Sequence, residues 1–177
     1  MPYLFAPMTP EQAREVVTWR YDPPYDFYNM DADEEGLHYM LDPHNPYYAA
    51  IDEDQHGDMA GFFCFQDAAR TLAGFLAGAY RDPDALDIGL GLRPALAGRG
   101  RGLDFMNAGL AFARETFHPA SFRLSVATFN RRAIAVYERA GFRPAGAFTH
   151  TSGRGVYEFM TMTRPATTTT TGAPMAK

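Results

Sequence analysis

Glycines and arginines between residues 86 and 103 form the segment of the chain best suited to bind a ligand. A strand-like run, Leu86–Leu92, leads into a turn, and the turn opens a helix. In that turn glycine recurs at every second position: Gly98, Gly100 and Gly102. Unpaired N–H groups at a helix N-terminus bind anions, and glycine lets a phosphate approach the backbone closely. The segment therefore predicts a phosphate site, to which Arg99 and Arg101 add positive charge.

The spacing of these glycines excludes two common phosphate-binding loops. The loop lacks the Lys-Ser/Thr pair of a P-loop, and Phe105 occupies the place of the third glycine if G-x-G-x-x-G starts at Gly100. Gly89 and Gly91 lie inside the preceding strand, where glycine often marks a bulge or a close approach to the backbone. A ligand that carries amides could pair with the strand there. The implied ligand has a pyrophosphate at one end and an amide-bearing arm at the other, and coenzyme A fits this description. The alternative is that the loop binds no ligand and is a plain helix start with flexible glycines.

A second motif lies downstream of the loop. Asn130 is followed seven residues later by Tyr137, which opens the run Tyr-Glu-Arg-Ala-Gly-Phe. The strand, proline and glycine loop, followed by this motif, resemble the GNAT superfamily of acyl-CoA-dependent N-acyltransferases. The resemblance covers about residues 47–163 in element order and is strongest over 86–142.

The resemblance implies a fold and a reaction. The fold is α/β (α+β), a mixed and mostly antiparallel central sheet of about six or seven strands flanked by about four helices. A bulged strand is expected at the coenzyme cleft. The reaction transfers an acetyl group from acetyl-CoA to a primary amine by direct attack, without a covalent enzyme intermediate. The acceptor would be a small molecule, a peptide or a protein N-terminus.

The resemblance also implies contacts with the coenzyme. The main chain of three residues would pair with the pantetheine arm: Leu90, Gly91 and Leu92. The loop amides would hold the pyrophosphate, and these belong to Gly98, Arg99, Gly100, Arg101, Gly102 and Leu103. Asn130 would face the pantetheine arm, and a role as the N-cap of its helix is compatible with that contact. Tyr137 would lie near the thioester sulfur.

Acyl transfer to an amine needs a neutral amine, a donor for the oxyanion and a proton for the leaving thiolate. Tyr137 is the candidate general acid, the alternative being a core tyrosine on the inner face of its helix. Asp87 is the candidate base, directly or through a water, the alternative being a solvated carboxylate at a strand end. Ser125 stands where another branch of the family carries a glutamate base. Ala97 departs from the Gln or Arg that opens the family's loop, a loss that would weaken coenzyme binding and that Arg99, Arg101 or Arg131 would compensate.

Aromatic residues before residue 29 predict the acceptor side, because acceptor sites of the family use the first helix–loop–helix. The candidates are Tyr21, Tyr25, Phe27 and Tyr28, and core packing is their alternative role. Acidic residues on this side would suit a cationic amine: Asp26, Asp31, Asp33, Glu34, Glu35, Asp82 and Asp84. A charge run is more often just a solvated face, so this indication is weak.

The pattern of elements predicts one domain over residues 1–163 and a disordered threonine-rich tail over 164–177. Strands are predicted over 3–7, 47–52, 59–65, 86–92, 122–127, 142–149 and 154–163. Helices are predicted from Pro10 to before Asp22 and over 31–41, 102–117 and 130–140. Residues 66–85 are expected to form a long loop.

Composition bounds the class of protein. The chain has 177 residues, 46% of them hydrophobic, and a net charge of −5, which gives no support to nucleic-acid binding. The single cysteine, Cys64, excludes an internal disulfide, and the five histidines have no ligand spacing, so no metal is expected. The chain shows neither a signal peptide nor a membrane-spanning run, which predicts a cytoplasmic protein. Small α/β domains often pair through edge strands, so a homodimer is left open as a partner.

Two other functions compete with the transferase. A catalytically silent acyl-CoA-binding sensor or regulatory module would keep the glycine loop without needing Asp87 or Tyr137. The presence of the tyrosine argues mildly against it. A Rossmann-type nucleotide-binding protein is disfavoured by the glycine spacing.

Overall fold

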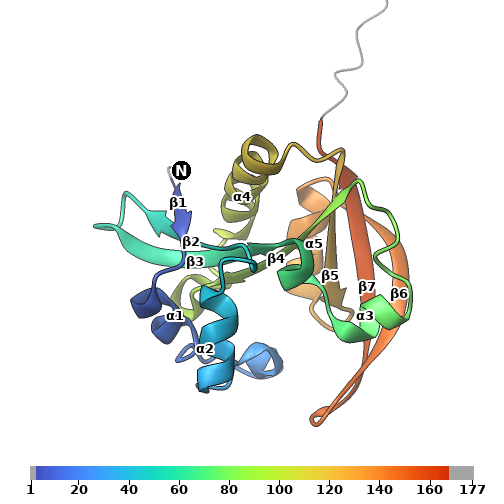
Figure 1. The fold of residues 1–177 in the computed structure, drawn as a ribbon, viewed down its shortest axis with the longest axis horizontal. Coiled ribbons are helices and arrows are strands. Elements are labelled where there is room, and N and C mark those ends of the chain that lie inside the picture. Colours follow the sequence, from blue (N-terminus) through green and yellow to red (C-terminus); the bar gives the residue numbers. More distant parts are fainter. Residues whose placement is uncertain (1–2, 168–177) are drawn as a thin grey trace, which may run out of the picture.

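Seven strands form one mixed sheet, which the computed structural model describes within residues 3–167 (Figure 1). The strands are β1 (Tyr3–Pro7), β2 (Tyr47–Asp52), β3 (Asp58–Phe65), β4 (Ala85–Leu92), β5 (Ser121–Ala127), β6 (Arg143–Ser152) and β7 (Gly155–Pro165). Their order is β1-β2-β3-β4-β5-β7-β6, with β4 and β5 parallel and every other neighbouring pair antiparallel. The predicted mixed, mostly antiparallel sheet is confirmed.

Helices cover both faces of this sheet. They are α1 (Pro10–Val16), α2 (Glu34–Leu41), α3 (Leu72–Leu76), α4 (Gly102–Phe117) and α5 (Arg131–Arg139). Successive residues of a strand point to opposite faces, and the neighbours Phe62 and Phe63 show what each face holds. Phe63 belongs to the core under α4 and α5, whereas Phe62 packs in the core under α1 and α2. Figure 1 shows α4 on one side of the sheet and α1 with α2 on the other.

Local sequence signals explain where several of these helices begin. Thr9 caps α1 through a capping box with Gln12, and Pro10 occupies the first helical position, as predicted. The predicted bounds of α4 are found unchanged, because its buried residues recur at helical spacing. They are Phe105, Met106, Gly109, Leu110 and Ala113.

The separation of β4 from β5 creates the space for a site. The two strands pair only over Ala85–Asp87 of β4, while the pairing with β3 begins at Ile88 and continues to Leu92. From Ile88 onward, β4 therefore has β3 on one edge and an open gap on the other. The register of β3 with β4 is constant, so this divergence frees backbone groups without a bulge in β4, which corrects that detail of the prediction. Among the described strand pairs, register shifts fall at Ala50/Ile51 and Pro144/Gly146.

Several boundaries differ from the prediction. The first helix ends at Val16 and not just before Asp22, and several strand ends shift by one to three residues. The expected loop over 66–85 contains a 3-10 turn and the short helix α3, which Thr71 caps. The second helix starts at Glu34 rather than residue 31, because Asp33 is its N-cap. Strand β7 continues past residue 163, since Arg164 still pairs with Phe122 of β5. The threonine-rich residues 168–177 lie outside the described part of the chain.

The described part of the chain holds no helix that is both long and apolar enough to cross a bilayer.

A small residue at position 109 is required for α4 to pack on the sheet. A Cβ added at Gly109 would overlap the ring of Phe63, which is fully buried on β3. We expect Gly109→Ala to lower the free energy of unfolding by about 1–3 kcal/mol, the usual cost of overpacking a core. Denaturant titration measures this change. Gly153→Ala is the matched control, because no atom lies within 4 Å of its added Cβ; equal losses in both variants would contradict the packing argument.

Candidate functional site

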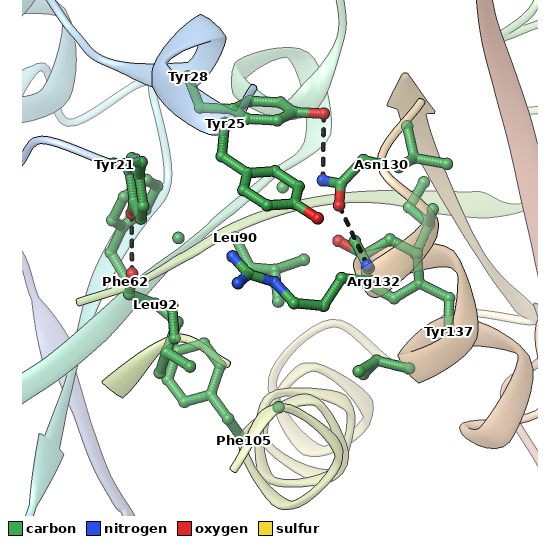
Figure 2. Close-up of a pocket in the computed structure, with 18 of the residues that line it drawn as sticks. Tyr21, Tyr25, Tyr28, Phe62, Leu90, Leu92, Phe105, Asn130, Arg132 and Tyr137 are labelled. Carbon is green, nitrogen blue, oxygen red and sulfur yellow. Dashed lines mark hydrogen bonds between the residues drawn. The ribbon is translucent and has the colours of Figure 1, made fainter. Parts of the chain in front are cut away.

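A cavity of about 470 Å³ opens where β4 and β5 diverge (Figure 2). This volume lies within the range of small-molecule sites. Its walls come from the segment after α1, from β4, from the glycine loop with the start of α4, and from β5 with α5. The cavity therefore collects most of the segments that the sequence indicates as functional.

The free edge of β4 presents backbone groups to this cavity. Arg93 N–H donates to the Ala60 carbonyl of β3 at 2.8 Å. Because backbone groups of an antiparallel strand point alternately toward and away from the partner strand, the N–H and C=O groups of Leu92 and Leu90 point away from β3, toward the gap. The Tyr21 hydroxyl approaches from that side and donates to the Leu92 carbonyl at 2.8 Å. The same alternation turns the polar groups of Gly91 toward β3, which corrects its predicted pairing with a ligand.

Gly91 has a different role, because a Cβ there would overlap the ring of Phe62. The absent side chain lets this ring lie against β4 at the edge of the cavity, whose lining includes both residues.

The start of α4 supplies unpaired donors to the opposite end of the cavity. Its N-cap residue, Arg101, makes no side-chain cap bond, so the first N–H groups of the helix receive no cap. Gly98 and Gly100 have φ values of 72° and 76°, a conformation that favours glycine and turns successive N–H groups to form an anion-binding concavity. Gly98, Gly100, Gly102 and Leu103 line the cavity. Backbone donors of this kind suit an anion such as a phosphate group.

The positive charge beside this loop does not come from the predicted arginines. The Arg101 guanidinium donates to buried Asp52 at 2.6 Å, and this hydrogen bond is the main cause that raises the pKa of Arg101. The exposed side chain of Arg99 does not line the cavity.

Arg132 of α5 lies there instead. Its guanidinium carbon is 4.1 Å from the centre of the Tyr25 ring, and its Nη1 would be 3.1 Å from a Cβ on Gly98. The side chain thus lies between the aromatic wall and the glycine loop (Figure 2). Sequence reasoning missed Arg132, and the only signal was its place two residues after Asn130 in the second motif.

Tyr137 and Asn130 occupy the α5 wall of the cavity. Burial raises the pKa of Tyr137, with a smaller contribution from Tyr28, so its hydroxyl stays protonated at neutral pH. Asn130 caps α5 by accepting from Ala133 N–H at 3.1 Å, and its Nδ2 donates to the Tyr28 hydroxyl at 3.2 Å. The cap role of Asn130 is therefore observed, and the same side chain also positions Tyr28.

Asp87 lies outside the lining of the cavity, which corrects its assignment as the base. Its carboxylate is buried and accepts from Arg123 Nε at 2.6 Å, Arg123 Nη2 at 2.8 Å and Arg70 Nε at 2.6 Å. Both guanidinium groups also lie over the ring of Tyr80. The carboxylate oxygens are thus occupied by guanidinium donors and do not reach the lining of the cavity.

The aromatic segment divides between the cavity and the core. Tyr21, Tyr25 and Tyr28 line the cavity, as predicted, together with Trp19 and Met30, which the sequence did not single out as acceptor contacts. Phe27 does not line it, which corrects the prediction. Its ring packs against Tyr157, Phe129 and Phe159 in the core beside β7. A 3-10 turn over Tyr25–Tyr28 directs these neighbours to different sides.

Other candidates for chemistry lie away from the cavity. Cys64 is a buried thiol whose pKa burial raises to about 12, which makes it a poor nucleophile. Within residues 3–167, no group of three or more His, Cys, Asp or Glu side chains is arranged to hold a metal ion.

Comparison with known families assigns the chain to a class. The family model for the acetyltransferase (GNAT) domain matches residues 3–143. Since this match spans most of the chain, the chain belongs to the GNAT acetyltransferase family. No curated protein matches it.

Solved structures share its fold at low sequence identity. A GNAT-family acetyltransferase from Bacillus anthracis superposes with a TM-score of 0.70 at 14% identity, covering 93% of this chain and 95% of that one. Aminoglycoside acetyltransferase AAC(6')-Ib, solved in complex with coenzyme A, gives 0.68 at 20% identity, covering 93% and 96%. A chimera of spermidine N-acetyltransferase SpeG from Vibrio cholerae and hSSAT gives 0.67 at 14% identity, covering 93% and 95%.

The position of Asp87 predicts a structural role. We expect Asp87→Asn to lower the free energy of unfolding by about 3–5 kcal/mol, because it leaves the buried Arg123 without its counter-charge. Thermal and denaturant unfolding measure this loss. A variant with unchanged stability and a kcat lower by orders of magnitude would contradict the structural role and restore Asp87 as a base.

Proposed function

We propose that this protein transfers an acetyl group from acetyl-CoA to a primary amine, by direct attack of the amine on the thioester. The single observation that carries the proposal is the cavity between the diverging β4 and β5. It joins unpaired backbone donors at the start of α4 to a partly buried tyrosine on α5, Tyr137. Membership of the GNAT family supports the same reaction.

The coenzyme would lie along the free edge of β4. The backbone groups of Leu90 and the N–H of Leu92 would pair with the amides of its pantetheine arm, as an added strand does. The uncapped N–H groups at Gly102 and Leu103, with the glycine loop, would bind its pyrophosphate. Arg132 would supply the cation that Ala97 lacks, since its guanidinium already lies beside Gly98.

The reaction then needs few groups from the protein. The amine nitrogen bonds to the thioester carbon, and a backbone N–H on the free edge of β4 that the pantetheine arm leaves unpaired stabilises the negative charge on the oxygen. When the C–S bond breaks, the Tyr137 hydroxyl gives its proton to the thiolate and regains one from the ammonium through solvent. Asp87 takes no part, because it is held by two arginines outside the cavity.

The silent acyl-CoA-binding module stays as a second candidate because of one observation. Among the described side chains that line the cavity there is no carboxylate and no imidazole. A protein that only binds the coenzyme needs no base, whereas a transferase without one depends on an acceptor that arrives neutral. Release of free coenzyme A in the presence of an amine distinguishes the two.

Tyr137→Phe tests the general acid. We expect kcat to fall about 10²–10⁴-fold, the usual contribution of acid–base catalysis, while the Kd for acetyl-CoA stays within a few-fold. Because burial raises the pKa of Tyr137, the acid form persists up to at least its ordinary value of about 10, so kcat should show no decline from this group between pH 7 and 9. Thiol release across this pH range measures both. An unchanged kcat in the variant would remove Tyr137 from the mechanism.

Arg132→Ala tests the phosphate contact. A hydrogen bond to a charged group contributes about 1.5–3 kcal/mol, so we expect the Kd for acetyl-CoA to rise roughly 10–100-fold. Isothermal titration calorimetry measures it. Arg131→Ala is the matched control, since Arg131 is the exposed neighbour on α5 and does not line the cavity. Equal weakening in both variants would point to general charge and not to the contact with the loop.

A further inference from the structure

The acceptor half of the cavity has an aromatic, uncharged wall. Trp19 and Phe62 are buried and lie nearly parallel, with ring centroids 6.1 Å apart and planes inclined by 29°. Tyr21, Tyr28 and Met30 continue this wall toward β5. The wall therefore offers flat apolar surface to whatever lies against it.

The tyrosines of this wall present their rings more than their hydroxyls. The Tyr21 hydroxyl is engaged by the Leu92 carbonyl at 2.8 Å, and the Tyr28 hydroxyl accepts from Asn130 at 3.2 Å. Burial raises the pKa of Tyr21 to about 12 and that of Tyr28 in the same direction, so both stay neutral. Neither supplies a negative charge for a cationic acceptor.

The charged groups that do line the cavity are cations. They are Arg132 and Arg139, and among the described lining residues neither an acidic side chain nor a lysine accompanies them. The candidate base, Asp87, does not line the cavity and is held in ion pairs with Arg123 and Arg70. A polycation would thus meet two arginines and no carboxylate, and this like charge disfavours its binding.

The same lining limits the basicity of the acceptor. An alkyl ammonium with a pKa near 10.4 is neutral in only about one molecule in 2,500 at pH 7. Without a carboxylate or imidazole to take its proton, only the neutral fraction of such an amine reacts. Its rate at pH 7 would therefore be about 2,500-fold lower than the rate of the fully neutral amine. An aromatic amine delocalises its lone pair into the ring, is neutral at pH 7 and needs no base.

We propose that the acceptor is a weakly basic amine carried on a flat aromatic body, which lies against the wall formed by Trp19, Tyr21 and Phe62. This assignment rests on the proposed acetyl transfer. The aromatic nitrogen bonds to the thioester carbon and the C–S bond breaks. The proton lost by nitrogen replaces the one that Tyr137 gives to the thiolate, so the products are an N-aryl acetamide and coenzyme A.

Four amines that differ in aromatic shape and in basicity test which of the two properties the site selects. They are p-anisidine (aromatic, weakly basic), benzylamine (aromatic, strongly basic), methoxyamine (weakly basic, not aromatic) and spermidine (a polycation). We expect kcat/KM for p-anisidine to be independent of pH from 7 to 9 and to exceed that for spermidine at pH 7 at least tenfold. Benzylamine should gain about tenfold in kcat/KM per pH unit as its neutral fraction grows, and methoxyamine should show a KM at least tenfold above that of p-anisidine.

A pair of variants at Met30 tests the missing charge. Met30→Glu places a carboxylate on the wall, and Met30→Gln is the matched control of the same size. We expect the glutamate variant to raise kcat/KM for spermidine and benzylamine at pH 7 at least tenfold above the glutamine variant, and to leave p-anisidine within a few-fold. Unfolding curves establish that both variants are folded. Equal rates for the two variants with every amine would contradict the argument from charge.

The outcomes also separate this inference from the proposed function. Faster turnover of spermidine than of p-anisidine by the unaltered protein at pH 7 would overturn the aromatic acceptor and leave acetyl transfer intact. Binding of acetyl-CoA without release of coenzyme A, for all four amines across pH 7–9, would overturn acetyl transfer itself and with it the aromatic acceptor.

Discussion

The parting of β4 from β5 after Asp87 is the constraint on which the rest of the molecule depends. Two parallel strands that separate leave backbone donors and acceptors without partners, and buried groups of this kind must be satisfied by something else. Here Tyr21 satisfies one of them, the carbonyl of Leu92. The others face the cavity, between the start of α4 and the wall formed by α5. The gap therefore leaves a free strand edge of the kind that a strand-like ligand can pair with.

The ion cluster around Asp87 lies at the point where the two strands part. Asp87 pairs in register with Arg123 of β5, and their side chains bond to each other there. Arg70 joins from the turn before α3, so one carboxylate ties together β4, β5 and the segment between β3 and β4. The last paired residues of β4 and β5 are thus fixed by charge. Asp87 therefore belongs to the ion pairs that hold the strands together and does not line the cavity.

Local signals predicted the elements well, and tertiary contacts decided the rest. The bounds of α4 and the cap at Asn130 follow from short-range spacing, so both could be predicted from the sequence. The ion pairs of Asp87 could not be predicted, because the sequence pattern of β4 does not show that its side chain meets Arg123 of β5. Phe27 could not either, since a 3-10 turn sends it to the core while its neighbour Tyr28 faces the cavity. Arg132 was missed because only the packing of α5 beside α4 brings it to the glycine loop.

The position of Arg132 over Tyr25 joins the two halves of the cavity. One guanidinium touches both the ring that faces the acceptor and the loop suited to phosphates. Phosphate binding at the loop would fix this side chain and, through it, the turn that carries Tyr25 and Tyr28. By reciprocity, whatever orders that turn must in equal measure favour the phosphates. A ligand at the glycine loop and a ligand at the aromatic wall are therefore coupled in their affinities through one side chain, that of Arg132.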